Sequence, residues 1–235
     1  MDLRAFRVES RTLQCTPRSR AHVAITELQE KYATQNLAQG YSEADPFTLE
    51  RYVQFHHFMP KHARSILDVG ANTGRGGQQL AKLGSDYQLI ALDCVQSRLD
   101  VLPKCYRRAI CALSNAIPAE DQRFDAIVAG EFLEHLYPSD VDPTLCEFQR
   151  VLKVGGRLLM TTPNPGYLRS WLTGGTIYTV GHLTQHWAGL LKTRLRMHGF
   201  SRIRVYGSGK MSRYIGYYFP VRMLYGSYLI IGDKI

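Results

Sequence analysis

Between residues 65 and 162, five short apolar segments alternate with stretches of helical periodicity. The apolar segments read SILDV (65–69), YQLIAL (87–92), YRRAIC (106–111), FDAIVAG (124–130) and GRLLMTT (156–162). Strands that alternate with helices and are almost continuously apolar are typical of a parallel sheet that helices cover on both faces. The alternation therefore predicts an α/β doubly wound fold.

Helical periodicity fills the gaps between these strands and also precedes them. The expected helices begin near Gly74, Val95 and Ser139, and two more cover residues 21–38 and 46–58. The helix after Ser139 runs into Gly155-Gly156, a pair that could supply a left-handed C-cap before the fifth strand. The two early helices form an N-terminal helical extension or lid, residues 1–60, ahead of a sheet domain at 61–235.

The last third of the chain completes the sheet. Residues 184–198 predict a helix, and residues 201–206 and 225–234 predict two further strands, which makes seven. Residues 207–224 contain too many aromatic side chains to be a simple turn.

The cysteines and the distribution of apolar residues indicate the cellular compartment of the protein. The five cysteines are scattered, odd in number and without a Cys-x-x-Cys pair, which suits a reducing cytoplasm. The chain has no stretch of about 18 apolar residues, and its first 15 residues lack a continuous apolar segment. We therefore expect a cytoplasmic protein without a membrane span.

The net charge of +9 comes entirely from residues 161–235, where ten lysines and arginines accompany a single acid, Asp233. Such an excess forms either a solvated basic face or a wall toward an anionic substrate, nucleic acid or lipid head groups. The sequence leaves both readings open.

The strongest local motif is ILDVGANTGRGGQQL, residues 66–80, which predicts a strand, a glycine-containing turn and a helix. Gly70 and Gly74 accept backbone angles that other residues resist, and they let a ligand approach the main chain. The N–H groups at the start of the helix point toward that ligand. Asp68, at the strand end, can accept from an ammonium group but would repel a pyrophosphate.

These residues resemble the first motif of the class I S-adenosylmethionine methyltransferases, Asp/Glu-x-Gly-x-Gly-x-Gly. Asn72 replaces the middle glycine and tolerates left-handed angles. The resemblance implies that Asp93, at the end of the second strand, accepts from the ribose hydroxyls of the cofactor. Many members carry an acid where this chain has Leu113, beside Ser114, whose backbone could serve the adenine. The implied cofactor-binding residues are Asp68, Gly70, Asn72, Gly74, Asp93, Cys94, Leu113, Ser114 and Gly130.

The resemblance continues through residues 124–136, 148–165 and 181–200, and covers roughly residues 60–206. Together these segments resemble the subgroup that includes ubiquinone-biosynthesis and many small-molecule and sugar methyltransferases. The fold implied is a Rossmann-like, mostly parallel sheet of order 3-2-1-4-5-7-6, and the cofactor implied is S-adenosylmethionine. Segments 163–183 and 207–224 would then be acceptor-binding insertions.

A hydroxyl acceptor needs a base, and the segment after the fourth strand supplies candidates. His135 is the candidate base, because ligands bind at the carboxyl ends of strands in open α/β sheets. Glu131 or Glu134 could hold its imidazole or take the proton.

Two other functions remain open. Glu131, Glu134, His135 and His182 resemble the ligand set of small-RNA terminal 2′-O-methyltransferases, which would suit a divalent cation; we do not favour a metal. The other alternative is a catalytically silent methyltransferase fold that serves as a binding subunit.

The methyl acceptor is expected to be a small molecule or glycan, and an anionic one. Lys210, Arg213 and Arg222 lie among tyrosines in segment 207–224, a combination that can hold a phosphate beside a sugar ring or lie on an anionic membrane surface. A nucleotide-linked or lipid-linked acceptor is favoured, with peripheral membrane contact as an option. Nucleic acid is disfavoured, because no known binding module accompanies the basic segment.

Overall fold

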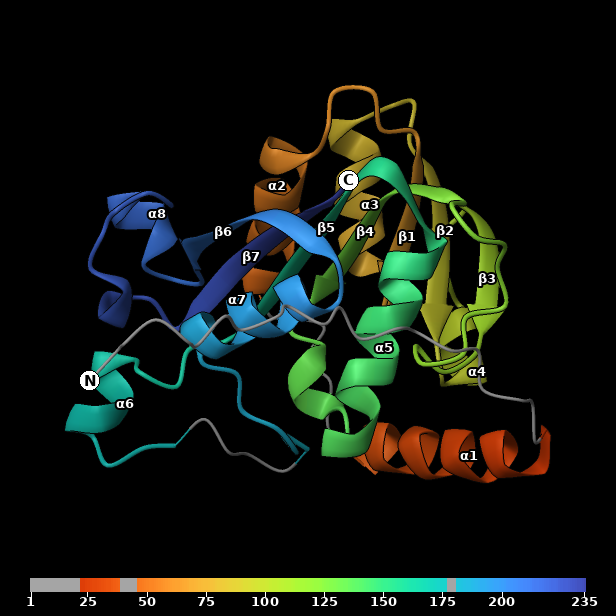
Figure 1. The fold of residues 1–235 in the computed structure, drawn as a ribbon, viewed down its shortest axis with the longest axis horizontal. Coiled ribbons are helices and arrows are strands. Elements are labelled where there is room, and N and C mark those ends of the chain that lie inside the picture. The colour runs from red at the N-terminus through yellow and green to blue at the C-terminus, as the bar shows by residue number, and fades with distance from the viewer. Residues whose placement is uncertain (1–21, 39–45, 177–180) are drawn as a thin grey trace, which may run out of the picture.

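The computed structural model describes residues 22–38, 46–176 and 181–235 (Figure 1). Its centre is a seven-stranded sheet with the order β3-β2-β1-β4-β5-β7-β6. The strands are β1 (Ser65–Val69), β2 (Gln88–Asp93), β3 (Tyr106–Cys111), β4 (Phe124–Gly130), β5 (Leu152–Pro163), β6 (Phe200–Ser208) and β7 (Ser227–Lys234). Only β7 runs antiparallel to its neighbours, β5 and β6, among these seven strands. The predicted fold class and strand order are therefore confirmed.

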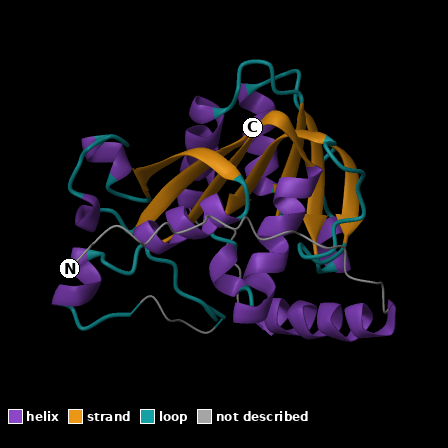
Figure 2. Cartoon of the chain, viewed as in Figure 1, coloured by secondary structure: helices purple, strands orange, loops and turns teal. Residues whose placement is uncertain are grey.

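Helices cover both faces of this sheet (Figure 2). The α-helices are α1 (His22–Ala38), α2 (Pro46–Phe58), α3 (Arg75–Leu83), α4 (Gln96–Leu99), α5 (Pro138–Val151), α6 (Leu168–Leu172), α7 (Ala188–Met197) and α8 (Ser212–Ile215). Two 3-10 turns, η1 (Leu133–His135) and η2 (Arg222–Leu224), complete the set.

Alternate residues of each strand pack against different helices. In β1, Ile66 belongs to the apolar cluster that contains Phe55 of α2, whereas Leu67 belongs to the cluster that contains Phe148 of α5. Both β1 residues are fully buried. This two-sided burial is why the parallel strands read as continuous apolar runs.

The helix α2 is part of the layer that covers the sheet. Its residues Tyr52, Phe55 and Phe58 are buried in the same cluster as Leu80 of α3. The predicted helix bounds, 46–58, agree with the structure, while a domain boundary at residue 60 stays a prediction.

The fifth strand begins earlier than predicted, at Leu152, and α5 ends without a glycine cap. Phe124 pairs with Leu152 and Ala126 pairs with Arg157, so the register shifts and the intervening residues of β5 bulge. Gly155, with φ +78°, lies in that bulge. The Gly155-Gly156 pair therefore shapes the strand, and the C-cap prediction is wrong.

The helix predicted at 184–198 is shorter, and α7 begins at Ala188. Thr184 explains the difference, because its side chain donates to the carbonyl of Leu133 and its backbone N–H donates to the carbonyl of Glu134. These bonds hold the segment before α7 against η1. None of the described helices is long and apolar enough to cross a membrane.

Candidate functional site

A cavity of about 440 Å³ lies at the carboxyl ends of β1, β2 and β4. Its walls include Gly70, Asp93 and Gly130 from the ends of these strands, and Tyr32 and Tyr52 from α1 and α2. The N-terminal helices thus close a space that the sheet edge leaves open, which is where open α/β sheets bind ligands.

The turn after β1 has the backbone shape that its residues predict. Gly70, Asn72 and Gly74 have φ angles of +67°, +51° and +83°. A Cβ at Gly70 would lie 2.8 Å from the ring of Phe132, and one at Gly74 would lie 2.5 Å from Pro103. Gly70 and Asn72 line the cavity, whereas Gly74 fixes the turn from behind it.

Asp93 lines the cavity and fixes the same turn. Its Oδ2 accepts from the backbone N–H of Asn72 at 2.9 Å, and its Oδ1 accepts from that of Val95 at 3.0 Å. The second bond is an Asx turn. Burial raises the pKa of the Asp93 carboxyl, although these N–H donors oppose the shift. Each oxygen keeps a lone pair for a further donor.

Asp68 is fully buried and does not line the cavity. Its two oxygens accept from the hydroxyls of Tyr52 at 2.6 Å and Tyr106 at 2.5 Å. Burial raises the pKa of Asp68 to about 6 in spite of both bonds. The carboxylate of Asp68 therefore contacts two tyrosines and does not face the cavity.

The remaining predicted cofactor residues lie together. Cys94, Leu113, Ser114 and Gly130 all line the cavity. A Cβ at Gly130 would lie 2.9 Å from Cδ of Arg51, so the absence of a side chain leaves room for α2.

His135 lines the cavity beside Glu131. Its Nδ1 lies 3.0 Å from the carbonyl of Gly181, so Nδ1 carries the proton and Nε2 carries the lone pair. Burial, with the charge of His182 next, lowers the pKa of His135 to about 4. The imidazole is therefore neutral at pH 7.

Glu134 lies behind the cavity wall and is almost completely buried. Its Oε2 accepts from the hydroxyl of Thr162 at 3.2 Å, while its Oε1 has no hydrogen-bond partner. Burial and the charge of Glu131 raise the pKa of Glu134.

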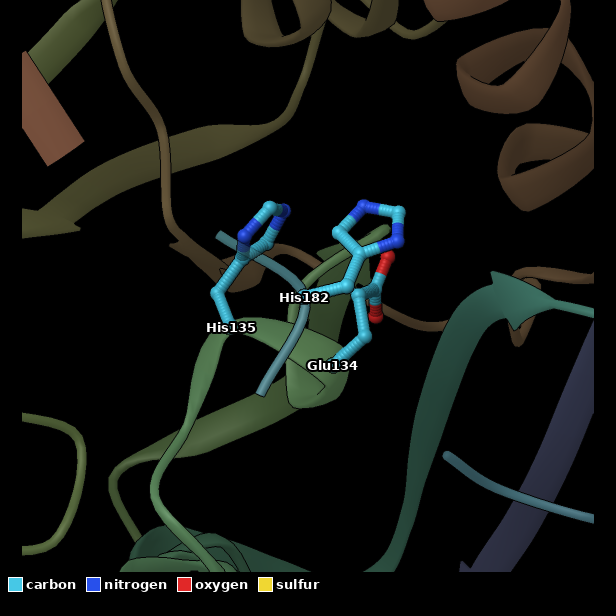
Figure 3. Close-up of side chains that lie close together, drawn as sticks. All are labelled: Glu134, His135 and His182. Atoms are coloured by element: carbon cyan, nitrogen blue, oxygen red, sulfur yellow. The ribbon is translucent and has the colours of Figure 1, made fainter. Parts of the chain in front are cut away.

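Glu134, His135 and His182 form a cluster (Figure 3). One ligand atom from each lies within 4.8 Å of the others, and the two imidazole rings are 5.0 Å apart. Glu131, the fourth member of the predicted metal set, is not in this cluster. Its carboxylate lies 3.8 Å from Arg51 and accepts from Ser227.

The residues that the N-terminal helices contribute to the cavity were not predicted from the sequence. Tyr32 and Asn36 come from α1, and Thr48, Arg51 and Tyr52 come from α2. Tyr52 is also a core residue, because it packs in the same buried cluster as Phe55. Asp140, in the first turn of α5, was missed as well. No local motif marks these residues, because they reach the cavity only through the packing of helices.

Residues 67–160 match the family model for the methyltransferase domain. They span β1 to β5 and contain the glycine turn, Asp93 and the His135 segment. The chain therefore contains a methyltransferase domain. Solved structures of S-adenosylmethionine-dependent methyltransferases have the same fold. One S-adenosylmethionine-dependent methyltransferase from Archaeoglobus fulgidus has a TM-score of 0.61 and 19% identity, covering 89% of this chain and 99% of that one.

A second solved structure is the Burkholderia thailandensis 1,6-didemethyltoxoflavin-N1-methyltransferase with S-adenosylhomocysteine, with a TM-score of 0.64 and 15% identity. The alignment covers 93% of the present methyltransferase and 92% of that chain. At such identities the likeness concerns the fold.

Curated relatives match a shorter part of the methyltransferase. An uncharacterized methyltransferase of Mycobacterium tuberculosis is 34% identical over 102 residues, which cover 43% of this chain and 40% of the relative. The human mitochondrial ubiquinone biosynthesis O-methyltransferase is 33% identical over 113 residues, covering 45% and 30%. The chain thus spans less than half the length of these relatives.

The cavity has groups that suit S-adenosylmethionine. The Asp93 carboxylate is available to hydroxyl donors, and the backbone around Gly70 is open to close approach. The Oδ1 atom of Asn72 is buried without a hydrogen-bond partner, which leaves an acceptor for a donor of the ligand.

Proposed function

We propose that this methyltransferase transfers a methyl group from S-adenosylmethionine to a hydroxyl of a small-molecule or glycan acceptor. The observation that carries the proposal is the position of His135 on the cavity wall, with its Nδ1 proton donated to Gly181 and its Nε2 lone pair available. A base in this tautomer can accept a hydroxyl proton.

The residues of this chain align the reactants and take the proton. When bound, S-adenosylmethionine supplies a methyl group on a sulfonium sulfur, which keeps the bonding electron pair. His135 would take the proton of the acceptor hydroxyl at Nε2, so that the oxygen could accept the methyl group. A carboxyl oxygen of Glu134 lies within 4.8 Å of a ring nitrogen of this imidazole. Alignment of the reactants supplies roughly 7–11 kcal/mol of the barrier, and the base about 10²–10⁴-fold in rate.

The experiment separates chemistry from binding. Tritium-labelled S-adenosylmethionine is incubated with a panel of nucleotide sugars and a catechol, because the human relative is named an O-methyltransferase of ubiquinone biosynthesis. His135→Ala is expected to lower turnover about 10²-fold or more while S-adenosylhomocysteine binds with nearly unchanged affinity. His62→Ala, an exposed site, is the control. Equal turnover in the two variants contradicts the proposal.

Thermal unfolding tests the cofactor assignment separately. At 100 times its dissociation constant, S-adenosylhomocysteine should stabilise the folded protein by about 2.7 kcal/mol in thermal unfolding. A protein that shows no stabilisation at any concentration would support a silent binding subunit.

A metal-assisted reaction is the second candidate, and the cluster of Glu134, His135 and His182 favours it. One carboxylate and two imidazoles within 4.8 Å suit a divalent cation, and three ligands leave positions open for acceptor oxygens. Glu134 adds the buried Oε1 atom that has no partner. The Gly181 carbonyl holds the His135 ring in the tautomer that presents Nε2, a common arrangement behind metal-bound histidines.

Binding of Mn²⁺, followed by electron paramagnetic resonance, distinguishes the two candidates. The metal candidate predicts one bound ion that Glu134→Gln and His182→Ala both remove and His62→Ala retains. It also predicts activity that is lost in a chelator and restored by a divalent ion. Full activity in a chelator eliminates it and leaves His135 as the base.

We further propose that the acceptor is anionic. A surface formed by the segments that follow β5 and precede β7 supports this. Exposed apolar and aromatic side chains gather on α6, α8, the segment after α8 and η2: Trp171, Leu172, Tyr214, Tyr218 and Met223. The exposed cations Arg169, Lys210, Arg213 and Arg222 accompany them. We call these nine residues the aromatic-basic face; α6 and α8 lie at the same end of the molecule in Figure 1.

Hydrogen bonds connect the segment that carries this face to the cavity wall at Glu131. Asn164, at the end of β5, donates to the carbonyls of Arg222 and Tyr225, and Ser227 hydrogen-bonds to Glu131 of the cavity wall. A groove of about 470 Å³ beside the face is lined by Tyr218 and Arg222 among others. Rings and a guanidinium together can hold a sugar and a phosphate, so a nucleotide-linked or lipid-linked acceptor is proposed.

A further inference from the structure

The cavity contains a carboxylate that neither the methyl transfer nor the ribose contact uses. Asp140 lies in the first turn of α5, lines the cavity and is only 5% exposed. None of the ion pairs in the described part of the chain includes it. A buried carboxylate without a cation needs hydrogen-bond donors.

Two side chains fix Asp140 in place. The hydroxyl of Tyr32 donates to Oδ2 at 2.7 Å, and Nδ2 of Asn115 donates to Oδ1 at 3.2 Å. The Tyr32 hydroxyl accepts in turn from the backbone N–H of Tyr137 at 2.8 Å. A carboxylate has about four acceptor positions, so Asp140 can accept further bonds from a ligand in the cavity.

Asp140 stands beside the loop that follows β3. Asn115 belongs to this loop, whose residues Leu113 and Ser114 also line the cavity. Ser114 is tied to α5 by a 2.8 Å bond between its hydroxyl and that of Thr144. Asp93 lies at the end of β2, which pairs with β3, so the loop after β3 lies next to the place proposed for the ribose and is the nearest wall for the base. The side chain of Leu113 has no polar atom with which to recognise that base.

We propose that Asp140 accepts the exocyclic amino group of the cofactor's adenine and selects adenine over a 6-oxopurine. The inference rests on the cofactor assignment of the proposed function. An adenine amino group donates toward the carboxylate. A 6-oxo group would place an acceptor against it, and two acceptors repel.

The test is calorimetric binding of S-adenosylhomocysteine and of S-inosylhomocysteine, whose base has an oxygen in place of the 6-amino group and a hydrogen on the adjacent N1. The unaltered protein should bind the adenine ligand at least 10-fold more tightly. Asp140→Asn, whose amide offers both a donor and an acceptor, should bring the ratio of dissociation constants close to one. Asp142→Asn is the matched control on the same helix, because Asp142 pairs with Arg194 and His198 and does not line the cavity.

The outcomes separate the inference from the proposed function. A ratio that Asp140→Asn leaves unchanged overturns the inference and keeps the cofactor assignment. Equal affinity of the unaltered protein for both ligands overturns it without any variant, which matters if Asp140→Asn folds poorly. Failure of the unaltered protein to bind S-adenosylhomocysteine at all overturns the cofactor assignment together with the inference.

Discussion

The hydroxyl of Tyr52 donates a 2.6 Å hydrogen bond to the carboxylate of Asp68, which joins the helix α2 to the end of β1. Tyr106 of β3 donates to the second oxygen. Both oxygens of a fully buried carboxylate are therefore held by neutral donors, and burial still raises its pKa to about 6 from the ordinary value of 3.8.

The first prediction follows from this raised pKa. The folded protein binds a proton on Asp68 more tightly than the unfolded chain does, so the stability gained by protonation is present below pH 4 and is lost as the pH rises through 6. Relative to Asp68→Asn, the unaltered protein should be on the order of 1 kcal/mol more stable at pH 5 than at pH 7.5. Urea unfolding at both values measures this. Asp86→Asn, at an exposed site, should show no such difference.

The fold could be predicted from the sequence because its signals are local. β1, β2 and β4 are apolar runs, and Gly70, Asn72 and Gly74 mark the turn after β1 by residue type alone. Asp93 is the last residue of its strand, so its place at the cavity was predictable too. The start of β5 was not, because the bulge around Gly155 depends on pairing with Phe124 of another strand.

The residues that close the cavity could not be predicted in the same way. Tyr32 and Asp140 are 108 positions apart in the chain, and nothing in either segment records their contact. Asp68 illustrates the same limit, since its motif predicts an ammonium partner while helix packing supplies Tyr52. Contacts of this kind arise from the tertiary arrangement of helices, which no local pattern encodes.

The second prediction concerns Gly76, where α3 approaches α2. A Cβ at Gly76 would lie 2.1 Å from the ring of Tyr52, so Gly76→Ala must displace the tyrosine from Asp68. The expected loss is about 1–3 kcal/mol of unfolding free energy, with weaker S-adenosylhomocysteine binding because both residues line the cavity. Gly189→Ala in α7 meets nothing within 4 Å and should stabilise by up to about 1 kcal/mol. Equal stability of the two variants would contradict the packing argument.

The third prediction concerns Asp93, whose proposed contacts to the ribose would be the same before and during the reaction. Asp93→Ala should raise the dissociation constant of S-adenosylhomocysteine about 10- to 100-fold, as the loss of charged hydrogen bonds worth roughly 1.5–3 kcal/mol implies. Turnover at saturating cofactor should change much less. Isothermal titration calorimetry measures the affinity, with Asp100→Ala as an exposed control on the neighbouring segment. Unchanged affinity would show that the ribose does not bind at Asp93.

The last prediction concerns the aromatic-basic face and the charge of the acceptor. None of the ten basic residues of 161–235 lines the main cavity, whose own cations are Arg51 and Arg98. The face must therefore act on a part of the acceptor that extends beyond the cavity, such as a phosphate.

Replacement of Lys210, Arg213 and Arg222 by Gln should raise the Michaelis constant of a nucleotide-linked or lipid-linked acceptor, and added salt should raise it for the unaltered enzyme. Arg213 also pairs with Glu50 of α2, so unfolding is measured beside activity. The matched control replaces Lys192, Arg196 and Arg202 by Gln, which removes the same charge from residues outside the face. If the Michaelis constant rises equally in both triple variants, only the overall charge matters. If it rises in neither and salt has no effect, the acceptor is not held by these cations.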